Sequence, residues 1–366
     1  MKRGMSHAAI LTSHITTGAA VSSDALGMRA ALERAGYDAR LYAESSDLSE
    51  PKVWPVSEIR DFLNSSNDLL IYHHSIGWDS ALDLLGELRC RRVVKYHNIT
   101  PASFFSGISA WHEEKCRQGR QQLRQIANVD CDLYFSDSDY NQQELLATGI
   151  DESKSLVLPP FHDIERLHAM EADLETLDRF RDGHTIVLSV SRIAPHKGHL
   201  DLLKAFATYH HSCNQNSRLL IVGRNEEVFS AYSARLRDLM TFLSIDDAVF
   251  FSGEVSDSVL RSFYLLGNVF VSASEHEGFG MPFVEAMATK VPVVAYSSSA
   301  ILETVGAGGI VLDNRDPEAM AESINLLVAD EAMNVAVGME GRRRYEKRFS
   351  EAVIEAQFLR AINSLN

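Results

Sequence analysis

Residues 274–285 read SEHEGFGMPFVE and carry a strong signal for the fold of this chain. It follows a short apolar run, Asn268–Ser272, which has the length and composition of a buried strand. Gly278 and Gly280 permit close approach of the backbone to a ligand, and Pro282 fits the first turn of a helix. Such a turn between strand and helix is typical of open parallel sheets, in which a helix N-terminus binds phosphate beyond the strand ends.

Two glutamates flank this turn. Glu277 precedes the glycines, and Glu285 is expected in the first turn of the helix, so both carboxylates would lie at the same helix end. Carboxylates accept hydrogen bonds from paired hydroxyls and therefore suit the diols of a sugar or ribose. The alternatives are that Glu285 caps its helix and that Glu277 is solvated.

A second loop carries two basic residues. Arg192 and Lys197 follow the expected strand Thr185–Val190 and precede a helix that begins near His199. Two cations at the carboxyl end of a parallel strand would stabilise the charge of a bound diphosphate. The alternative is that they pair with surface acids.

A third loop, Gly253–Asp257, follows the expected strand Ala248–Phe251 and is a candidate for holding a nucleobase through Val255 and Asp257. The Asp257 carboxylate would accept from the paired N–H donors of guanine. A helix N-cap is the other interpretation of Asp257.

Both halves of the chain alternate short apolar runs with amphipathic stretches. In the first half, strands are expected at Ala8–Thr12, Ala39–Ala43, Asp68–Tyr72, Arg92–Tyr96, Asp132–Phe135 and Ser155–Leu158. In the second half, they are expected at Thr185–Val190, Arg218–Val222, Ala248–Phe251, Asn268–Ser272, Val291–Ala295 and Gly309–Leu312. The pattern predicts an α/β protein with two Rossmann-like, doubly wound domains.

The domain boundary is expected after Pro159–Pro160, because consecutive prolines do not fit a helix or a central strand. The predicted domains are residues 1–160 and residues 161–348, followed by a terminal helix at residues 349–366.

Composition bounds the partners and the location. The net charge of −15 argues against general nucleic-acid binding, and the four cysteines lack metal-ligand spacing. No apolar run approaches the roughly 20 residues that cross a bilayer, and no signal peptide is recognised, so a cytoplasmic protein is expected. One basic stretch, Arg89–Arg124, is either a solvated helix face or a patch for anionic lipid headgroups at the inner face of the membrane.

Four motifs together resemble those of the retaining glycosyltransferases of family 4, also described as glycosyl transferases group 1. They are the Ser191-Arg192 pair with Lys197-Gly198, Val222-Gly223-Arg224, Phe251–Val255, and Glu277–Ala288. The resemblance implies the GT-B fold, in which two Rossmann-like domains face a cleft, with the last helix returning to the first domain. Arg224 departs from the family pattern, in which a small or acidic residue commonly follows Val-Gly.

The same resemblance assigns candidates in the first half. Gly18 lies in a loop after the first strand that in the family contacts the donor phosphates. His97 corresponds to the histidine near the transferred sugar, although a structural histidine bonded to the loop backbone is the alternative. The run His97–Pro101 resembles mannosyl- and rhamnosyltransferases of bacterial surface polysaccharide synthesis, and Ser138 resembles a serine common to the family.

The resemblance implies that Glu285 binds the nucleotide ribose, Glu277 the donor-sugar hydroxyls, and Arg192 with Lys197 the diphosphate, without an obligatory metal. The predicted catalytic residues are Glu277, His97, Arg192 and Lys197. The predicted donor-binding residues are Glu285, Gly278, Phe279, Gly280, Met281, Gly18, Val255, Asp257 and Arg224.

The function expected is transfer of a hexose, mannose-like in preference, from a nucleoside-diphosphate sugar to a glycan or lipid-linked acceptor with retention of configuration. A GDP-sugar is favoured as donor, a UDP-sugar stays open, and no cofactor is expected. The alternatives are a non-catalytic nucleotide-sugar-binding protein, or an epimerase or phosphorylase on the same fold. A metal-dependent transferase is a further rival, because Asp130–Asp132 and Asp137–Asp139 both read Asp-x-Asp.

Overall fold

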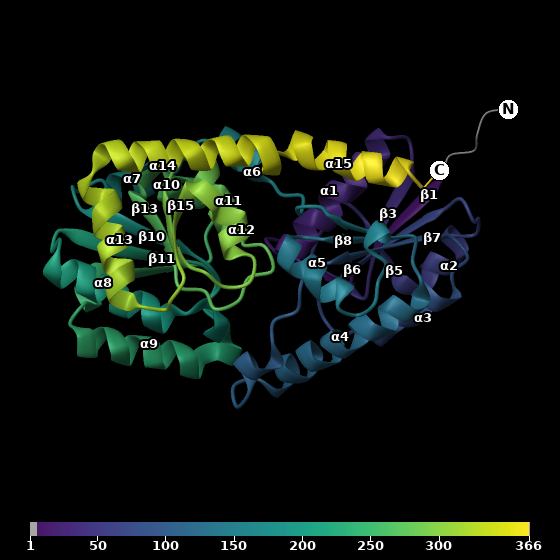
Figure 1. The fold of residues 1–366 in the computed structure, drawn as a ribbon, viewed down its shortest axis with the longest axis horizontal. Helices are drawn as coiled ribbons and strands as arrows, with labels where there is room; N and C mark the ends of the chain where they lie inside the picture. Colours follow the sequence, from purple (N-terminus) through teal and green to yellow (C-terminus); the bar gives the residue numbers. More distant parts are fainter. Residues whose placement is uncertain (1–5, 366) are drawn as a thin grey trace. The chain divides into compact units, whose positions relative to one another are not determined.

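The computed structural model describes residues 6–365, which divide into two compact units. The first unit comprises residues 6–103, 111–163 and 351–365, and the second comprises residues 104–110 and 164–350. Each unit has a parallel sheet of its own, as the ribbon shows (Figure 1).

The first unit is built on a seven-stranded sheet with the order β5-β3-β1-β6-β7-β8-β9. Its strands are β1 (His7–Leu11), β3 (Asp38–Ala43), β5 (Val53–Pro55), β6 (Leu69–His74), β7 (Arg91–Tyr96), β8 (Leu133–Ser136) and β9 (Ser155–Val157), beside a small pair, β2 (His14–Ile15) and β4 (Ser45–Ser46). Its helices are α1 (Ala20–Arg34), α2 (Ile59–Phe62), α3 (Asp79–Glu87), α4 (Ala110–Val129), α5 (Asp139–Leu146) and α15 (Glu351–Asn363).

The second unit has a six-stranded sheet with the order β12-β11-β10-β13-β14-β15. Its strands are β10 (Thr185–Val190), β11 (Ser217–Val222), β12 (Val249–Gly253), β13 (Val269–Ser272), β14 (Val293–Tyr296) and β15 (Gly309–Leu312). Its helices are α6 (Ile164–Ala169), α7 (Leu174–Phe180), α8 (His199–Ser212), α9 (Ser230–Leu243), α10 (Asp257–Leu266), α11 (Met281–Ala288), α12 (Ile301–Val305), α13 (Pro317–Ala329) and α14 (Glu331–Arg344).

The fold prediction is confirmed. The expected strands of both halves are present, with ends that differ by no more than two residues, and the ladders in both sheets are parallel. Strand β5, a short edge strand beside β3 that ends in Pro55, was not predicted from the sequence. Proline is tolerated there because an edge strand has one side without ladder hydrogen bonds.

The two units divide after Asp163 and after Ser350. The boundaries predicted from the sequence lie a few residues earlier, after residues 160 and 348. The segment Phe104–Ala110, expected in the first domain, clusters with the second unit instead. The physical reason is aromatic packing, since the Phe105 ring stacks on Phe229 at 6.1 Å between centroids.

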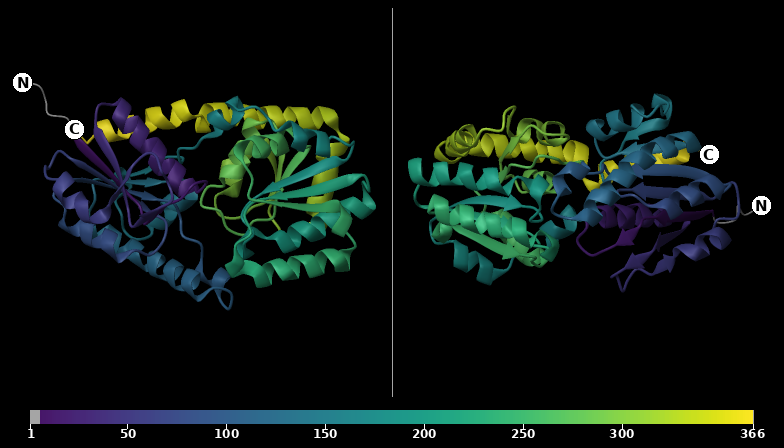
Figure 2. Two further views of the ribbon diagram at one scale, coloured as in Figure 1. Left: turned by 180° about the vertical axis from the view of Figure 1, so that it is seen from behind. Right: turned by 90° about the horizontal axis from the view of Figure 1, so that it is seen from below.

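The terminal helix α15 belongs to the first unit, as the family resemblance implied. Ile354, Phe358 and Ile362 recur at helical spacing and are buried in that unit's core. Figures 1 and 2 show α15 beside α1, where the Arg34 guanidinium contacts the Glu355 carboxylate at 2.6 Å.

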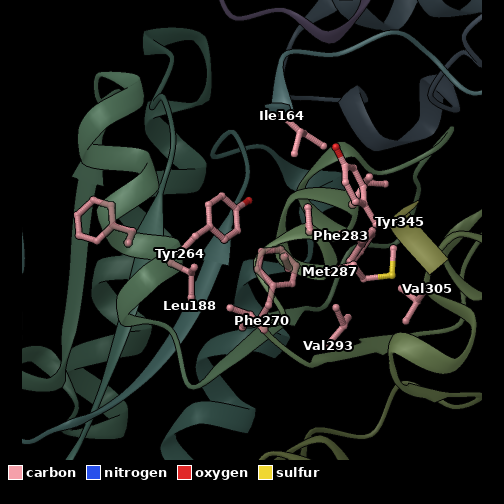
Figure 3. Close-up of a cluster of buried hydrophobic side chains, with 14 of the residues drawn as sticks. Ile164, Leu188, Tyr264, Phe270, Phe283, Met287, Val293, Val305 and Tyr345 are labelled. Atoms are coloured by element: carbon pink, nitrogen blue, oxygen red, sulfur yellow. The ribbon is translucent and has the colours of Figure 1, made fainter. Parts of the chain in front are cut away.

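The core of the second unit gathers apolar side chains beneath α10 and α11 (Figure 3). The ring of Phe270 on β13 packs edge-on against Phe283 at 5.6 Å between centroids and stacks against Tyr264 at 6.4 Å. This packing fixes α10 and α11 against the sheet, and with them the loops that precede these helices.

Candidate functional site

The predicted site lies at the switch point of the second sheet. Strands β10 and β13 are neighbours in the sheet although β11 and β12 lie between them in the sequence. From β10 the chain adds β11 and β12 on one side, and it then returns to add β13, β14 and β15 on the other side. Ligands of open parallel sheets bind beyond the carboxyl ends of the strands at such a point. The loop with Arg192 and Lys197 follows β10, and the loop with Glu277 follows β13.

Lys197 and Glu277 are brought together as an ion pair. Lys197 Nζ lies 2.6 Å from Glu277 Oε1, and the Ser274 hydroxyl donates to the same oxygen at 2.8 Å. Both charged side chains are largely buried, with 15% and 13% of their surface exposed. Burial strengthens the attraction between them, so the two loops present one preorganised charged centre.

The loops after β10 and β13 are also connected through their backbones. The Glu275 N–H donates to the His196 carbonyl at 2.8 Å. Gly198 adopts φ +67°, and a Cβ at this position would lie 1.9 Å from the Ala273 carbonyl oxygen. Only glycine fits this approach, which explains why Lys197 is followed by Gly198 in the sequence.

Helix α11 begins as predicted, with Gly280 as its N-cap at φ +91° and Pro282 in its first turn. The expected place of Glu285 is wrong, because the helix begins at Met281 and its first turn contains no acidic residue. Glu285 therefore does not cap the helix either.

Glu285 is instead held by a residue that the sequence analysis missed. The Tyr264 hydroxyl of α10 donates to Glu285 Oε2 at 2.5 Å. Burial raises the pKa of Glu285 above its usual value, while the hydrogen bond from Tyr264 acts in the opposite direction. Tyr264 leaves no local signal in the sequence, because it lies one helix earlier in the chain.

Two of the predicted donor-binding side chains belong to the core. The Phe279 ring is buried and packs edge-on against Phe349 at 5.5 Å, and its carbonyl accepts a hydrogen bond from Thr304. Met281 packs against the same cluster. Phe279 can therefore face a ligand only through its backbone, whereas Met281 is only partly buried. Gly278 and Gly280 have no side chains that would keep a ligand away from the backbone.

The two arginines of the second unit share one carboxylate. Arg192 lies 3.2 Å and Arg224 3.4 Å from Glu226 Oε1, and both arginine side chains are half exposed. Arg192 thus has the acid partner that the alternative interpretation gave it. Because the pair is exposed, solvent screens it, and exchange of the acid for a diphosphate costs little.

Asp257 is the first residue of α10, and the N-cap position belongs to Ser256, so the N-cap interpretation of Asp257 is wrong. Its carboxylate lies 2.8 Å from Arg166 and is exposed. Val255 packs against the core cluster from its edge.

In the first unit, Gly18 lies in an exposed turn at φ +75° with no heavy atom within 4 Å of a Cβ built on it. His97 is placed differently, because both of its ring nitrogens are occupied. His97 Nδ1 lies 3.0 Å from Asp137 Oδ2, and His97 Nε2 lies 2.8 Å from Nδ1 of His73. The alternative interpretation, in which the His97 ring bonds to the loop backbone, is not what the structure shows, because both partners are side chains.

A network of side-chain hydrogen bonds that was not predicted from the sequence holds the loop after His97. Asn98 has φ +68° and donates to Asn141 and Glu144 at 2.9 Å each. The Glu144 carboxylate also accepts from Tyr96 at 2.7 Å. Asparagine tolerates this left-handed backbone, which explains its place in the His97–Pro101 run.

The two Asp-x-Asp pairs differ in exposure, because Asp130 and Asp132 are both exposed whereas Asp137 is buried. Asp130 pairs with Lys154 at 2.5 Å, while Asp132 accepts from the Arg92 N–H at 2.7 Å. Asp137 is buried against Lys95 at 2.7 Å, whereas Asp139 is exposed at the start of α5.

The basic stretch Arg89–Arg124 is partly neutralised within the first unit. Arg117 pairs with Glu113 at 2.8 Å, and Arg120 pairs with Glu144 at 2.6 Å. Within residues 6–365, no helix has the length and apolar character that crossing a bilayer requires.

Comparison with solved structures defines the class of fold. Sucrose-phosphate synthase from Thermosynechococcus elongatus superposes with a TM-score of 0.77 at 20% identity, covering 98% of this chain and 99% of that one. Anabaena HepE in complex with UDP superposes with the same TM-score at 18% identity, covering 98% and 100%. The chain thus has the GT-B fold of two Rossmann-like domains.

Sequence comparison then identifies a family domain within the second unit. Residues 178–344 match the family model of Glycosyl transferases group 1, so the second unit carries a domain of that family. The capsular polysaccharide biosynthesis glycosyltransferase CapM of Staphylococcus aureus is 32% identical over 182 residues, 49% of this chain and 46% of that protein.

A second relative is the GDP-mannose-dependent alpha-(1-6)-phosphatidylinositol monomannoside mannosyltransferase of Mycobacterium tuberculosis, strain H37Rv. It is 30% identical over 236 residues, which are 61% of this chain and 59% of that protein. The chain thus matches about half to three fifths of the length of these curated relatives.

Proposed function

We propose that this protein transfers a hexose from a nucleoside-diphosphate sugar to a glycan or lipid-linked acceptor. The observation that carries the proposal is the Lys197–Glu277 pair at the switch point of the second sheet. In this pair, Lys197 is the proposed ligand of the diphosphate and Glu277 is the proposed ligand of the sugar hydroxyls, and the two side chains are in contact.

In this proposal, Lys197 and Arg192 stabilise the charge that develops on the leaving diphosphate. Glu277 accepts from the donor-sugar hydroxyls, and Glu285 accepts from the ribose. The backbone at Gly278 and Gly280 approaches the phosphates before the N-terminus of α11, supporting the remaining negative charge. His97 is proposed to lie beside the transferred sugar, with its ring held in place by Asp137 and His73.

We propose further that the reaction retains the configuration of the transferred sugar and needs no metal. The two basic side chains offset the charge of the diphosphate in place of a divalent cation. A β-phosphate oxygen is then the base for the acceptor hydroxyl, so that no side chain acts as nucleophile.

A GDP-sugar, and mannose in particular, is the donor that we favour. The Mycobacterium tuberculosis relative is named as GDP-mannose-dependent, and the exposed Asp257 carboxylate in the third loop suits the paired N–H donors of guanine. A UDP-sugar stays the second candidate, because HepE was solved with UDP.

The test is a screen of GDP-, UDP- and dTDP-sugars, in which the shift of the unfolding temperature and the hydrolysis of each donor are measured. The proposal expects one class of donor to raise the midpoint and to be hydrolysed slowly without acceptor. Stabilisation without turnover, even with acceptor mixtures, would instead favour the non-catalytic binder.

We propose that the acceptor brings the first unit to an anionic membrane surface. The Trp111 side chain at the start of α4 is 53% exposed, and an amphipathic aromatic ring suits the interface of a bilayer. Sedimentation with vesicles of anionic and of zwitterionic lipid tests this, with Trp111→Ala as the variant expected to lose the anionic binding.

A further inference from the structure

The first unit contains a buried group of ionisable side chains, gathered from four elements around the end of β7. All have no more than 6% of their side-chain surface exposed. They are Asp24 on α1, His73 on β6, Lys95 on β7, His97 directly after β7 and Asp137 directly after β8. We call these five residues the buried network.

The charges of the buried network do not balance at neutral pH. Two carboxylates and one ammonium leave one negative charge uncompensated if both imidazoles are neutral, as they are in water. Lys95 lies 2.7 Å from Asp137 Oδ1 and 4.0 Å from Asp24 Oδ2, and it also donates to the Leu158 carbonyl. A buried charge without a partner of opposite sign lowers the free energy of unfolding.

Three polar atoms converge at the unbalanced end. His73 Nδ1 and His97 Nε2 are 2.8 Å apart, and Asp24 Oδ2 lies 3.7 Å from the first and 3.5 Å from the second. Asp24 Oδ1 accepts from the Phe161 N–H at 2.8 Å, but Asp24 Oδ2 has no hydrogen-bond partner among the described residues.

We propose that the buried network binds one proton more than its groups hold in water at neutral pH, and that the Asp24 carboxyl group holds this proton at Oδ2. The proton removes the uncompensated charge. The hydrogen bond between His73 Nδ1 and His97 Nε2 uses an N–H that a neutral imidazole already carries, so the extra proton is left for Asp24 Oδ2.

The two carboxylates differ in a way that agrees with this assignment. Burial raises the pKa of Asp24. Burial acts in the same direction on Asp137, but the charges of His97 and Lys95 outweigh it, so the pKa of Asp137 is lowered. Asp137 is therefore the ionised partner of Lys95, and Asp24 is the group whose charge requires the extra proton.

A metal ion is the other cation that Asp24, His73 and His97 suggest, since their ligand atoms lie within 4.8 Å of one another. The ring geometry opposes it. The imidazole centroids are 5.0 Å apart at an interplanar angle of 19°, so the two facing nitrogens lie almost on the line between the rings. Each nitrogen is directed at the other, as in an N–H···N hydrogen bond, and not at a common ion, and the Lys95 ammonium would repel a divalent cation.

The buried network also fixes His97. Asp137 and His73 occupy the two ring nitrogens of His97 and so fix the orientation of its ring. Asp24 and His73 are therefore positioning residues, which act through His97 and touch no substrate themselves. This role rests on the proposed function, whereas the extra proton does not.

The test compares the pH dependence of unfolding of the full chain and of Asp24→Asn, which keeps the shape of the side chain and removes the charge. Above about pH 7.5 the unfolded chain holds almost no proton on these carboxylates and imidazoles, whereas the native wild type holds one. Wild-type stability should therefore fall as the pH rises, relative to the variant. The expected ratio of the two folding constants falls about tenfold per pH unit until the native network releases its proton.

Asp137→Asn is the second variant and is expected to give the same slope, because it also removes one carboxylate charge. Asp68→Asn is the matched control, since Asp68 is a buried carboxylate of the same unit that accepts from the N–H groups of Asn64 and Ser65 at 3.0 and 2.9 Å. Above about pH 7.5, its folding constant should keep a fixed ratio to the wild type.

A pH-independent ratio for both Asp24→Asn and Asp137→Asn would overturn the proposal. So would a rise of the unfolding midpoint on adding Zn²⁺ that is lost in Asp24→Asn, because the site would then bind a metal. The measurements need neither donor nor acceptor, so failure of the extra proton and failure of the proposed function are told apart.

Discussion

Lys197 Nζ lies 2.6 Å from Glu277 Oε1, which makes the proposed diphosphate ligand and the proposed sugar ligand partners of each other. The two residues come from loops after β10 and β13, which are 80 residues apart in the chain. The pair keeps a cation and a carboxylate largely buried in place before any ligand arrives, and preorganised charges of this kind are effective in transition-state stabilisation.

Lys197→Ala should lower turnover at least tenfold, which corresponds to about 1.4 kcal/mol of transition-state stabilisation. The reason is that the variant loses the cation that faces the leaving group. Steady-state kinetics with the donor found in the screen measures this effect. Lys204→Ala is the matched control, because Lys204 is an exposed lysine on α8 that pairs with Asp201 at 2.9 Å. Equal rates for folded Lys197→Ala and wild type would contradict the site assignment.

Tyr264→Phe should shift the pH dependence of donor binding. Burial raises the pKa of Glu285 and the Tyr264 hydrogen bond lowers it, so loss of the hydroxyl raises the pKa of Glu285 further. Binding that needs the ionised carboxylate is lost as the pH falls, and in the variant this loss should begin at a higher pH. Donor affinity measured across the acid range tests the shift.

The control for this variant is Tyr209→Phe, which removes a buried hydroxyl of α8 that accepts from Asn214 at 3.4 Å. It should leave the acid limb of the binding profile in place. If the two variants have the same profile, Tyr264 does not act through Glu285.

Glu285→Gln should stabilise the protein at neutral pH while it lowers turnover at least tenfold. Burial holds the folded-state pKa of Glu285 above the unfolded value, so its contribution to stability is lost as the pH rises through the folded pKa. The uncharged isostere avoids that loss. Its unfolding midpoint should therefore exceed that of the wild type at neutral pH, and the difference should shrink towards acid pH.

A variant that is less stable than the wild type at all pH values would show that the ionised carboxylate is favourable in the fold. Such an outcome would leave the pKa argument for Glu285 without support, whatever the effect on turnover.

The loops at the switch point were predictable because their residues carry local signals. Glycine and proline mark the start of α11, and the apolar run of β13 marks the strand before it, so Glu277 could be placed from sequence alone. The position of Glu285 was misjudged for a local reason as well. The helix begins one residue before Pro282, and this places Glu285 beyond the first turn.

The partners of these residues were not predictable, because they come from elsewhere in the chain. Tyr264 reaches Glu285 only after α10 and α11 have packed on the same sheet, and His73 reaches His97 only after β6 and β7 have paired. Phe279 stands between two site glycines, yet its side chain is drawn into the core by Phe349. Pattern and spacing do not show which way such a side chain turns.

Gly198→Ala should destabilise the second unit by a few kcal/mol, at about the upper range for single substitutions. A Cβ there would meet the Ala273 carbonyl oxygen at 1.9 Å, and φ +67° is unfavourable for alanine. Denaturant unfolding measures the cost. Gly183→Ala is the matched control, because Gly183 has φ +89° but open space around its Cβ position, so it reports the backbone strain alone. Equal losses in the two variants would mean that the β10 and β13 loops separate at little cost.

Transfer should survive removal of divalent cations by a chelator, because Arg192 and Lys197 are proposed to take the place of a metal at the diphosphate. The rival, a metal-dependent transferase, needs a carboxylate pair such as Asp137 and Asp139. In the structure Asp137 is committed to Lys95 and His97, and only Asp139 is exposed. Asp139→Asn should therefore keep wild-type turnover, whereas Lys197→Ala should lose it. Loss of transfer in the chelator, restored by added Mg²⁺ or Mn²⁺ and abolished in Asp139→Asn, would decide for the metal-dependent mechanism.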